Sequence, residues 1–285
     1  MCLLVLAWNM HPRYRVVIAA NRDEFHDRAA APLAWWVDRP YTLAGRDLRG
    51  GGTWMGVSRS GRFGVVTNYR ELEPPPSTHA PSRGDLVTGF LACGRPAASY
   101  LEALRGRAGR YAGFSLLVGD ARELYYFTNR NGRSGTPLAP GIYGLSNHLL
   151  DSPWPKLLRA RQTLARLVAD DDLEPHRLFA LLADREPAAE DEVPDTGLPR
   201  DWERAISAPF VAHGRYGTRA STLLLIEHAG RVTMHERRFD AAGELTGATR
   251  RQFDSGAEDG GRVGHAAEEL SRRCALHEKF GTSPE

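Results

Sequence analysis

The chain has few cysteines, no long apolar run and little net charge. Its three cysteines, Cys2, Cys93 and Cys274, are odd in number and far apart in 285 residues, which predicts a reduced, cytoplasmic protein rather than a disulfide scaffold. The first apolar run ends at Asn9, too short for a signal peptide, and no stretch approaches the roughly 20 apolar residues of a membrane span. A net charge of +2 gives no reason to expect binding to nucleic acid.

Metal and phosphate motifs are also missing. The ten histidines are scattered without the spacing of metal ligands. The glycine-rich segment RGGGTWMG, residues 49–56, lacks the Lys-Ser/Thr of a phosphate-binding loop and is typical of a turn that enters a strand. We therefore predict no metal site and no required cofactor.

Short apolar segments in pairs predict β-hairpins. We expect strands within residues 2–8 and 14–20, 53–69, 113–130, 141–148 and 219–239, an irregular segment over 26–50, and helices over 85–92, 99–105, 151–171 and 174–183. Asp151 or Ser152 would cap the helix predicted over residues 151–171. This order predicts a mostly antiparallel α+β protein. We expect one domain over residues 1–253 and a polar, flexible tail over residues 254–285.

Two unusual features lie at the start of the chain. A cysteine occupies position 2, and the apolar run before Ala20 ends in the charged stretch NRDE. Pairing the first two strands about position 11 places Cys2 opposite roughly Ala20, so the NRDE stretch begins beside the chain start. Adjacent strand residues point to opposite faces, so Arg22 and Asp23 can both face the thiol only if the strand bends.

Cys2 is the strongest catalytic candidate. Methionine before a small residue is usually removed, and Cys2 would then carry both a thiol and an α-amino group with a pKa near 7.7–8.0. That residue could act as nucleophile and base at once. Arg22 would favour the thiolate, and Asp23 would orient the amine. The alternatives are a small buried residue at position 2 and a turn with surface ion pairs at positions 22 and 23.

Three further polar residues lie at the ends of apolar runs. Asn68 and Asn147 could each donate a hydrogen bond to a developing oxyanion, or could simply form turns. Arg219 could bind an anion, or could be a solvated charge at a strand end.

Taken in order, several motifs resemble the NRDE family, relatives of the transport and Golgi organization protein 2. They are the initial MC, AANRDEF, GGTWMGV, GVVTNYRE, SRGDLV, YGLSNHLLDSPWPK and YGTRASTLLLI, and they cover the chain to about residue 240. The resemblance implies an N-terminal nucleophile hydrolase-type fold, a four-layer αββα sandwich of two antiparallel sheets between helical layers.

A more remote resemblance links the chain to cysteine amidases that cleave bile-salt conjugates and penicillin V. It implies a site made of Cys2, Arg22, Asp23, Asn68, Asn147 and Arg219. In the amidases the Arg and the Asp are separated in sequence, whereas Arg22 and Asp23 are neighbours here, so their two roles are not carried over individually.

Two functions follow from these resemblances. One is an N-terminal cysteine hydrolase that cleaves a non-peptide amide of a small molecule through a thioester, with Asn147 stabilising the oxyanion. The other is a non-catalytic carrier of haem, acyl-coenzyme A or another lipid, as the family's links to haem trafficking imply. The carrier would use the same cleft, lined by Trp35, Trp36 and Trp54. The sequence carries no readable code for the substrate or the oligomeric state.

Overall fold

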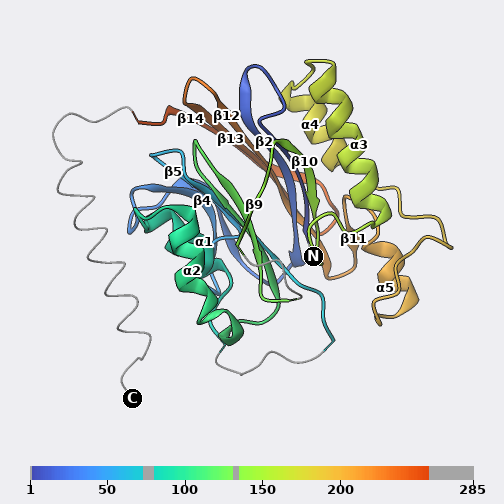
Figure 1. The fold of residues 1–285 in the computed structure, drawn as a ribbon. Coiled ribbons are helices and arrows are strands. Elements are labelled where there is room, and N and C mark those ends of the chain that lie inside the picture. The colour runs from blue at the N-terminus through green and yellow to red at the C-terminus, as the bar shows by residue number, and fades with distance from the viewer. Residues whose placement is uncertain (1, 73–79, 131–134, 257–285) are drawn as a thin grey trace.

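Two seven-stranded antiparallel sheets pack face to face between two layers of helices (Figure 1). The structure, a computed structural model, describes residues 2–72, 80–130 and 135–256. The predicted α+β sandwich is therefore confirmed. The expected tail lies almost wholly outside the described residues. Within the ranges described, no helix is both long and apolar enough to cross a membrane.

The first sheet carries both chain segments that the sequence singles out. Its strand order is β10-β1-β2-β12-β13-β14, with the short β11 paired to β12. The bounds are β1 Cys2–Trp8, β2 Tyr14–Phe25, β10 Gly141–Leu145, β11 Ala212–His213, β12 Tyr216–Glu227, β13 Arg231–Phe239 and β14 Leu245–Asp254. Because β1 lies between β2 and β10, the start of the chain has a neighbour on both sides.

The second sheet follows the chain order from β3 to β9. Its strands are β3 Ala30–Trp35, β4 Thr42–Asp47, β5 Met55–Ser58, β6 Phe63–Asn68, β7 Phe114–Gly119, β8 Leu124–Thr128 and β9 Thr136–Pro137. The helices are α1 Gly84–Ala92, α2 Ala97–Arg105, the 3-10 turn η1 Ala108–Arg110, α3 Pro155–Ala169, α4 Pro175–Leu182 and α5 Arg200–Ala205. Helices α1 and α2 cover the second sheet, and α3 and α4 cover the first (Figure 1).

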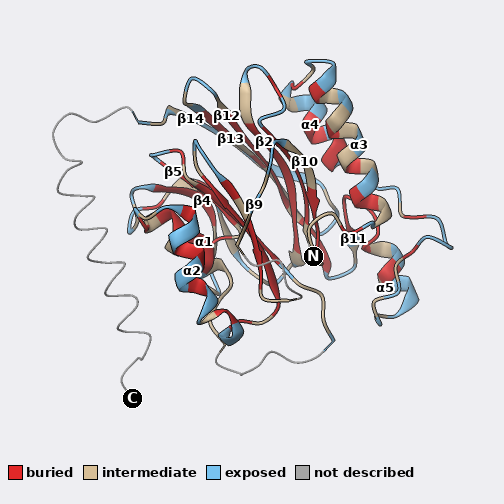
Figure 2. Ribbon diagram, viewed as in Figure 1, coloured by how far each residue is buried: buried red, intermediate tan, exposed pale blue. Residues whose placement is uncertain are grey.

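Strict alternation along β1 and β2 builds two separate apolar layers. Leu4, Leu6 and Ile18 face the second sheet, whereas Leu3, Val5 and Val17 face α3 and α4. Figure 2 shows the buried residues gathered on the strands and the inner sides of the helices. Both faces of β1 are therefore buried, which explains why its sequence reads as a continuous apolar run.

Several expectations about local structure are wrong. The segment 26–50 contains strands β3 and β4, and β14 continues the first sheet beyond the predicted last strand. Helix α3 begins at Pro155 without a side-chain cap, because the Asp151 carboxylate accepts a hydrogen bond from the Gly144 backbone instead. A short helix, α5, lies in a region for which no element was predicted.

Candidate functional site

The first hairpin brings Cys2 directly opposite Arg22, two residues further along than the predicted partner Ala20. The hairpin is centred on Pro12 rather than on position 11, and Ala20 pairs with Leu4. Cys2 and Arg22 are cross-strand neighbours at the rim of a cleft of about 680 Å³ between the ends of the two sheets. Five of the six predicted site residues line this cleft: Cys2, Arg22, Asp23, Asn68 and Asn147.

Asn147 connects the start of the chain to the second sheet. Its Oδ1 accepts a hydrogen bond from the backbone nitrogen of Cys2 at 2.8 Å, and its Nδ2 donates to the Asn68 carbonyl at 2.9 Å. The neighbouring Ser146 donates to the Cys2 carbonyl at 2.7 Å. The Asn147 amide thus holds the Cys2 nitrogen, which differs from the oxyanion role that the sequence suggested.

Arg22 and Asp23 lie on opposite faces of the first sheet, as alternation requires. Arg22 continues the Ile18–Ala20 face toward the second sheet, where its guanidinium stacks 4.5 Å from the ring centre of Trp54. Asp23 lies on the other face, and its Oδ1 accepts a hydrogen bond from the Thr218 hydroxyl at 2.7 Å. The two charges therefore reach the Cys2 region from different sides.

Arg22 is buried in an acidic environment. Only 5% of it is exposed, and Nη2 lies 3.8 Å from Asp47 and 4.0 Å from Glu24. Its buried Nη1 has no hydrogen-bond partner among the described residues. Burial lowers the pKa of Arg22, against the attraction of Glu24, Cys2 and Asp47. A buried guanidinium nitrogen without a hydrogen-bond partner is costly.

The thiol itself is held mainly in its protonated form. Burial raises the pKa of Cys2, and the negative charge of Asp23 raises it further. A hydrogen bond from the Asp23 backbone and the charge of Arg22 act in the opposite direction. A nucleophilic Cys2 therefore needs a base to remove its proton.

Arg219 does not line the cleft within the described residues. It is the residue inserted at a bulge in β12, between the Thr218–Asp23 and Ala220–Arg22 pairs. Its guanidinium instead donates to the carbonyl oxygens of Phe25 and His26, at 3.2 and 2.9 Å. In the structure Arg219 therefore fixes the end of β2 through these two hydrogen bonds.

Two charged residues that were not among the predicted site residues also lie at or near the cleft. Arg83 lines the cleft and donates to the Gly113 carbonyl at 3.0 Å, and burial lowers its pKa, while the charge of Cys2 acts in the opposite direction. Lys156 is 2% exposed, and its pKa falls to about 8, chiefly through burial. Both residues lie in motifs that carry the family resemblance, Arg83 in SRGDLV and Lys156 in YGLSNHLLDSPWPK, but neither motif has a chemical signature of its own. For Lys156, the available signal is a lysine next to Leu157 on the buried face of an amphipathic helix.

A hydrogen-bonded chain lies beside the two asparagines. The Ser152 hydroxyl donates to the Leu149 carbonyl, so it accepts from Nδ1 of His148 at 2.7 Å. Nε2 of His148 is then the acceptor, and the Tyr69 hydroxyl donates to it at 2.8 Å. Tyr69 lines the cleft next to Asn68, so this chain fixes one wall of the site.

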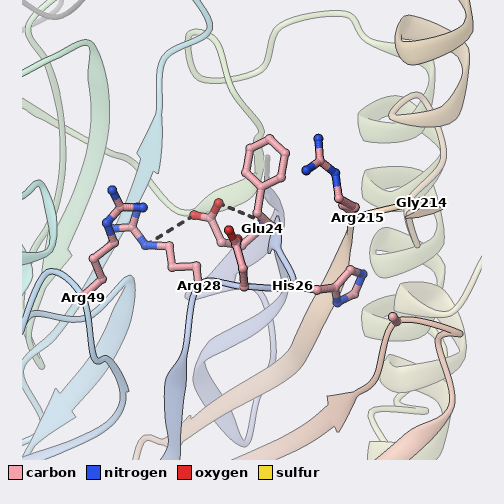
Figure 3. A pocket seen from close by; sticks show the side chains of 9 residues that line it. Glu24, His26, Arg28, Arg49, Gly214 and Arg215 are labelled. Atoms are coloured by element: carbon pink, nitrogen blue, oxygen red, sulfur yellow. Dashed lines mark hydrogen bonds and ion pairs between the residues drawn. The ribbon is translucent and has the colours of Figure 1, made fainter.

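A second pocket of about 620 Å³ adjoins the cleft and shares Glu24, Phe25 and Arg28 with it. In Figure 3 the carboxylate of Glu24 lies beside the guanidinium of Arg28, from which it is separated by 3.8 Å. Arg49 and Arg215 lie on either side of this pair (Figure 3).

Few residues of the cleft suit a metal or a haem. The described ranges contain no group of three or more His, Cys, Asp or Glu side chains arranged to hold a metal ion. Cys2 is the one cysteine, histidine or methionine among the described residues of the cleft. Of the three tryptophans expected to line it, Trp54 does so, whereas Trp36 donates to the Ala44 carbonyl and Trp35 packs on Phe253.

Residues 1–241 match the sequence profile of the family described as Transport and Golgi organisation 2. The chain belongs to this family. The Transport and Golgi organization protein 2 homologue of Bos taurus is 35% identical over 261 residues, covering 83% of this chain and 92% of that one. The Homo sapiens homologue is 33% identical, with 83% and 92% coverage, and the Drosophila melanogaster protein is 25% identical, with 81% and 90%. The family resemblance inferred from the motifs is confirmed.

Solved structures similar to this family member have low sequence identity. Penicillin V acylase from Agrobacterium tumefaciens is 12% identical, with a TM-score of 0.44 over 90% of this chain and 87% of that one. The C2A mutant of conjugated bile acid hydrolase from Clostridium perfringens is 7% identical, with a TM-score of 0.48 over 91% and 94%.

Proposed function

We propose that the chain is an N-terminal cysteine hydrolase that cleaves a non-peptide amide of a small molecule through a thioester. The observation that carries the proposal is the 2.8 Å hydrogen bond between the Cys2 nitrogen and Asn147 Oδ1, in a cleft that Arg22 and Asp23 also line. Removal of Met1 would turn this nitrogen into an α-amine. Asn147 would then hold that amine next to the thiol of the same residue.

The α-amine supplies the base that the thiol requires. Its ordinary pKa of about 7.7–8.0 lets a large share of it be neutral near pH 7.5. It takes the proton of Cys2 Sγ while the sulfur attacks the amide carbonyl, and it gives that proton to the departing amine as the C–N bond breaks. Water then attacks the thioester, releases the carboxylic acid and restores the thiol.

Asn68 is the side chain best placed to assist the oxyanion. It lies at the end of β6, is exposed to the cleft, and is tied to Asn147 through its own carbonyl. Its side-chain amide can donate to the tetrahedral oxygen, and the positive charge of Arg22, which lines the same cleft, also favours a negative oxygen there. Asn147 then positions the amine, and Asn68 and Arg22 stabilise negative charge.

Intact-mass measurements test the proposal in two steps. We expect the purified protein to lack Met1, and we expect incubation with a panel of N-acyl p-nitroanilides to add one acyl mass and release nitroaniline. In Cys2→Ala we expect neither the added acyl mass nor the release of nitroaniline. Cys93→Ala retains them, because Cys93 is buried outside the cleft. Full retention of Met1, or equal nitroaniline release by Cys2→Ala, would exclude the mechanism.

A haem titration on the same samples addresses the carrier hypothesis. A hydrolase without a haem site gives no stoichiometric Soret shift. A tight shift that disappears in Cys2→Ala, together with no acylation by any amide, would replace the hydrolase with a haem carrier. Acyl-coenzyme A binding without acylation would replace it with a lipid carrier.

A further inference from the structure

A small apolar cluster lies at the cleft, separate from the three large cores between and outside the sheets. Ile206, Val211 and Tyr216 form its buried part, and Leu198 and Trp202 pack against them. Leu198, Trp202, Ile206 and Tyr216 also line the cleft. The cluster is therefore both a small core of its own and part of the cleft wall.

Phe25 extends this cluster into the cleft. It is the last residue of β2 and lines both the cleft and the adjoining pocket. Its ring lies edge-on to that of Tyr216, with the ring centres 5.1 Å apart, and its centre is 6.5 Å from that of Trp202. We call the side chains of Phe25, Trp202 and Tyr216 the aromatic shelf. Phe25 is 45% exposed, although the apolar residues 16–20 of the same strand are buried.

The surrounding fold holds the rings of the aromatic shelf in place. The Tyr216 hydroxyl donates to the Asp23 carbonyl at 3.1 Å. Trp202 packs edge-on to His213, with the ring centres 5.0 Å apart. The two hydrogen bonds from Arg219 fix the end of β2, which carries the third ring. A ligand that packs on the shelf therefore has little side-chain freedom to restrict, which favours binding.

The aromatic shelf lies within reach of the candidate nucleophile. Arg22 is the cross-strand partner of Cys2, and Phe25 follows three residues later, about 10 Å further along the extended strand. Alternation places Phe25 on the same side of β2 as Asp23, whereas Arg22 and Glu24 face the second sheet. A molecule with its amide at Cys2 would therefore meet charged side chains on one side and the shelf on the other.

An apolar group that covers the shelf removes apolar surface from water, which is the main source of affinity in small-molecule sites. Single exposed apolar side chains are common on protein surfaces, whereas contiguous apolar surface inside a cleft is typical of a ligand site. Phe25 belongs to the second case, because the two rings that it contacts line the same cleft.

We propose that the aromatic shelf is a specificity-determining subsite, which binds an apolar group of the substrate while the amide lies beside Cys2. The substrate class is then an amide that carries an alkyl or aryl group on one side of its C–N bond. The position of the amide rests on the proposed function. The affinity of the shelf for an apolar group does not, because it requires no reaction at Cys2.

Calorimetric titration of the Cys2→Ala protein with two pairs of isomeric amides tests the proposal. The short pair is N-methylbutanamide and N-propylacetamide, and the long pair is N-methyloctanamide and N-heptylacetamide. Within each pair the alkyl chain lies on the acyl side or on the amine side. Burial of one methylene strengthens binding about fourfold. We therefore expect at least one long amide to bind about tenfold or more tightly than its short counterpart, and the preferred isomer identifies the side that faces the shelf.

Two further substitutions in the Cys2→Ala background locate the effect. Phe25→Ser should reduce the gain from the longer chain to less than about threefold and leave the affinity for the short amides unchanged. Leu158→Ser is the matched control, because Leu158 is 47% exposed on α3 and is not among the described residues that line the cleft. It should retain the full gain.

Equal affinity for long and short amides would overturn the proposal, and so would the same gain in Phe25→Ser and in Leu158→Ser. Failure of the hydrolase proposal gives a different result, because acylation is not read in these titrations. A long amide that binds tightly to the shelf but never acylates the wild-type protein would exclude the hydrolase and leave the subsite in place.

Discussion

The side chain of Asn147 holds the backbone nitrogen of Cys2, 145 residues earlier in the chain, at 2.8 Å. The contact joins the end of β10 to the start of β1, and the second half of the same amide reaches Asn68 on the other sheet. One amide thus ties the candidate nucleophile to both sheets.

Replacing Asn147 should slow thioester formation far more than it changes stability. Asn147→Ala removes the acceptor of the hydrogen bond from the Cys2 nitrogen, which becomes the α-amine once Met1 is removed. We expect the rate of thioester formation to fall about 100-fold, at the lower end of what a positioned proton-transfer group contributes. The rate of acyl-mass gain measures it. Ser146→Ala is the control, because it removes only the hydrogen bond to the Cys2 carbonyl. An unchanged rate in Asn147→Ala would contradict the assigned role.

Glu203 should be important for the stability of the cleft wall. Its carboxylate is 2% exposed and bonds Arg70 at 2.7 Å, while Arg70 stacks on Trp154. Glu203→Ala leaves the buried guanidinium without this partner, so we expect a loss of about 3–5 kcal/mol in the free energy of unfolding. Glu190→Ala, at an exposed ion pair with Arg200, should cost less than about 1 kcal/mol. Equal losses in urea unfolding would contradict this prediction.

His148 should contribute to acid sensitivity. Burial lowers its pKa, and the charge of Arg70 lowers it further. Its folded-state pKa therefore lies below the unfolded one, so this contribution is fully present above about pH 6.5 and is lost as pH falls through the folded pKa. His148→Gln should make the decrease in stability below pH 6.5 shallower. His176→Gln, an exposed control, should leave the slope unchanged. Thermal unfolding between pH 4.5 and 7 provides both slopes.

Gly52 and Gly84 allow two backbone segments to approach each other closely beside the cleft. A Cβ on Gly52 would lie 2.6 Å from the Gly84 carbonyl carbon, so the turn before β5 contacts the start of α1 without space for a side chain. Gly52→Ala should destabilise the protein by about 1–3 kcal/mol through overpacking. Gly94→Ala, where a Cβ meets nothing within 4 Å, should change stability by less than about 0.5 kcal/mol. Calorimetric melting that ranks the two variants in the opposite order would contradict the prediction.

The sequence alone determined the class of the fold and most of the cleft. Paired apolar segments give antiparallel strands because side-chain alternation and turn residues act locally, and the same reasoning placed Cys2 near the NRDE stretch. Strands β3 and β4 were not predicted, because apolar and polar residues alternate only weakly along them and their pairing is set by neighbouring strands. The hairpin register was wrong by two residues because Pro12, not position 11, lies at its centre.

Only the tertiary structure decided which polar residues meet. Asn68 ends β6 of the second sheet and Asn147 follows β10 of the first, and nothing in their local sequence indicates that the Asn147 amide donates to the Asn68 carbonyl. Arg219 resembled a site residue, but a bulge directs it to the end of β2. Lys156 has the sequence of an ordinary helix lysine, but the packing of α3 on the first sheet buries it, and its Nζ donates to the Ile206 carbonyl. Local sequence fixes which side of its own element a residue faces, whereas its partners across the molecule are chosen by how whole sheets and helices pack.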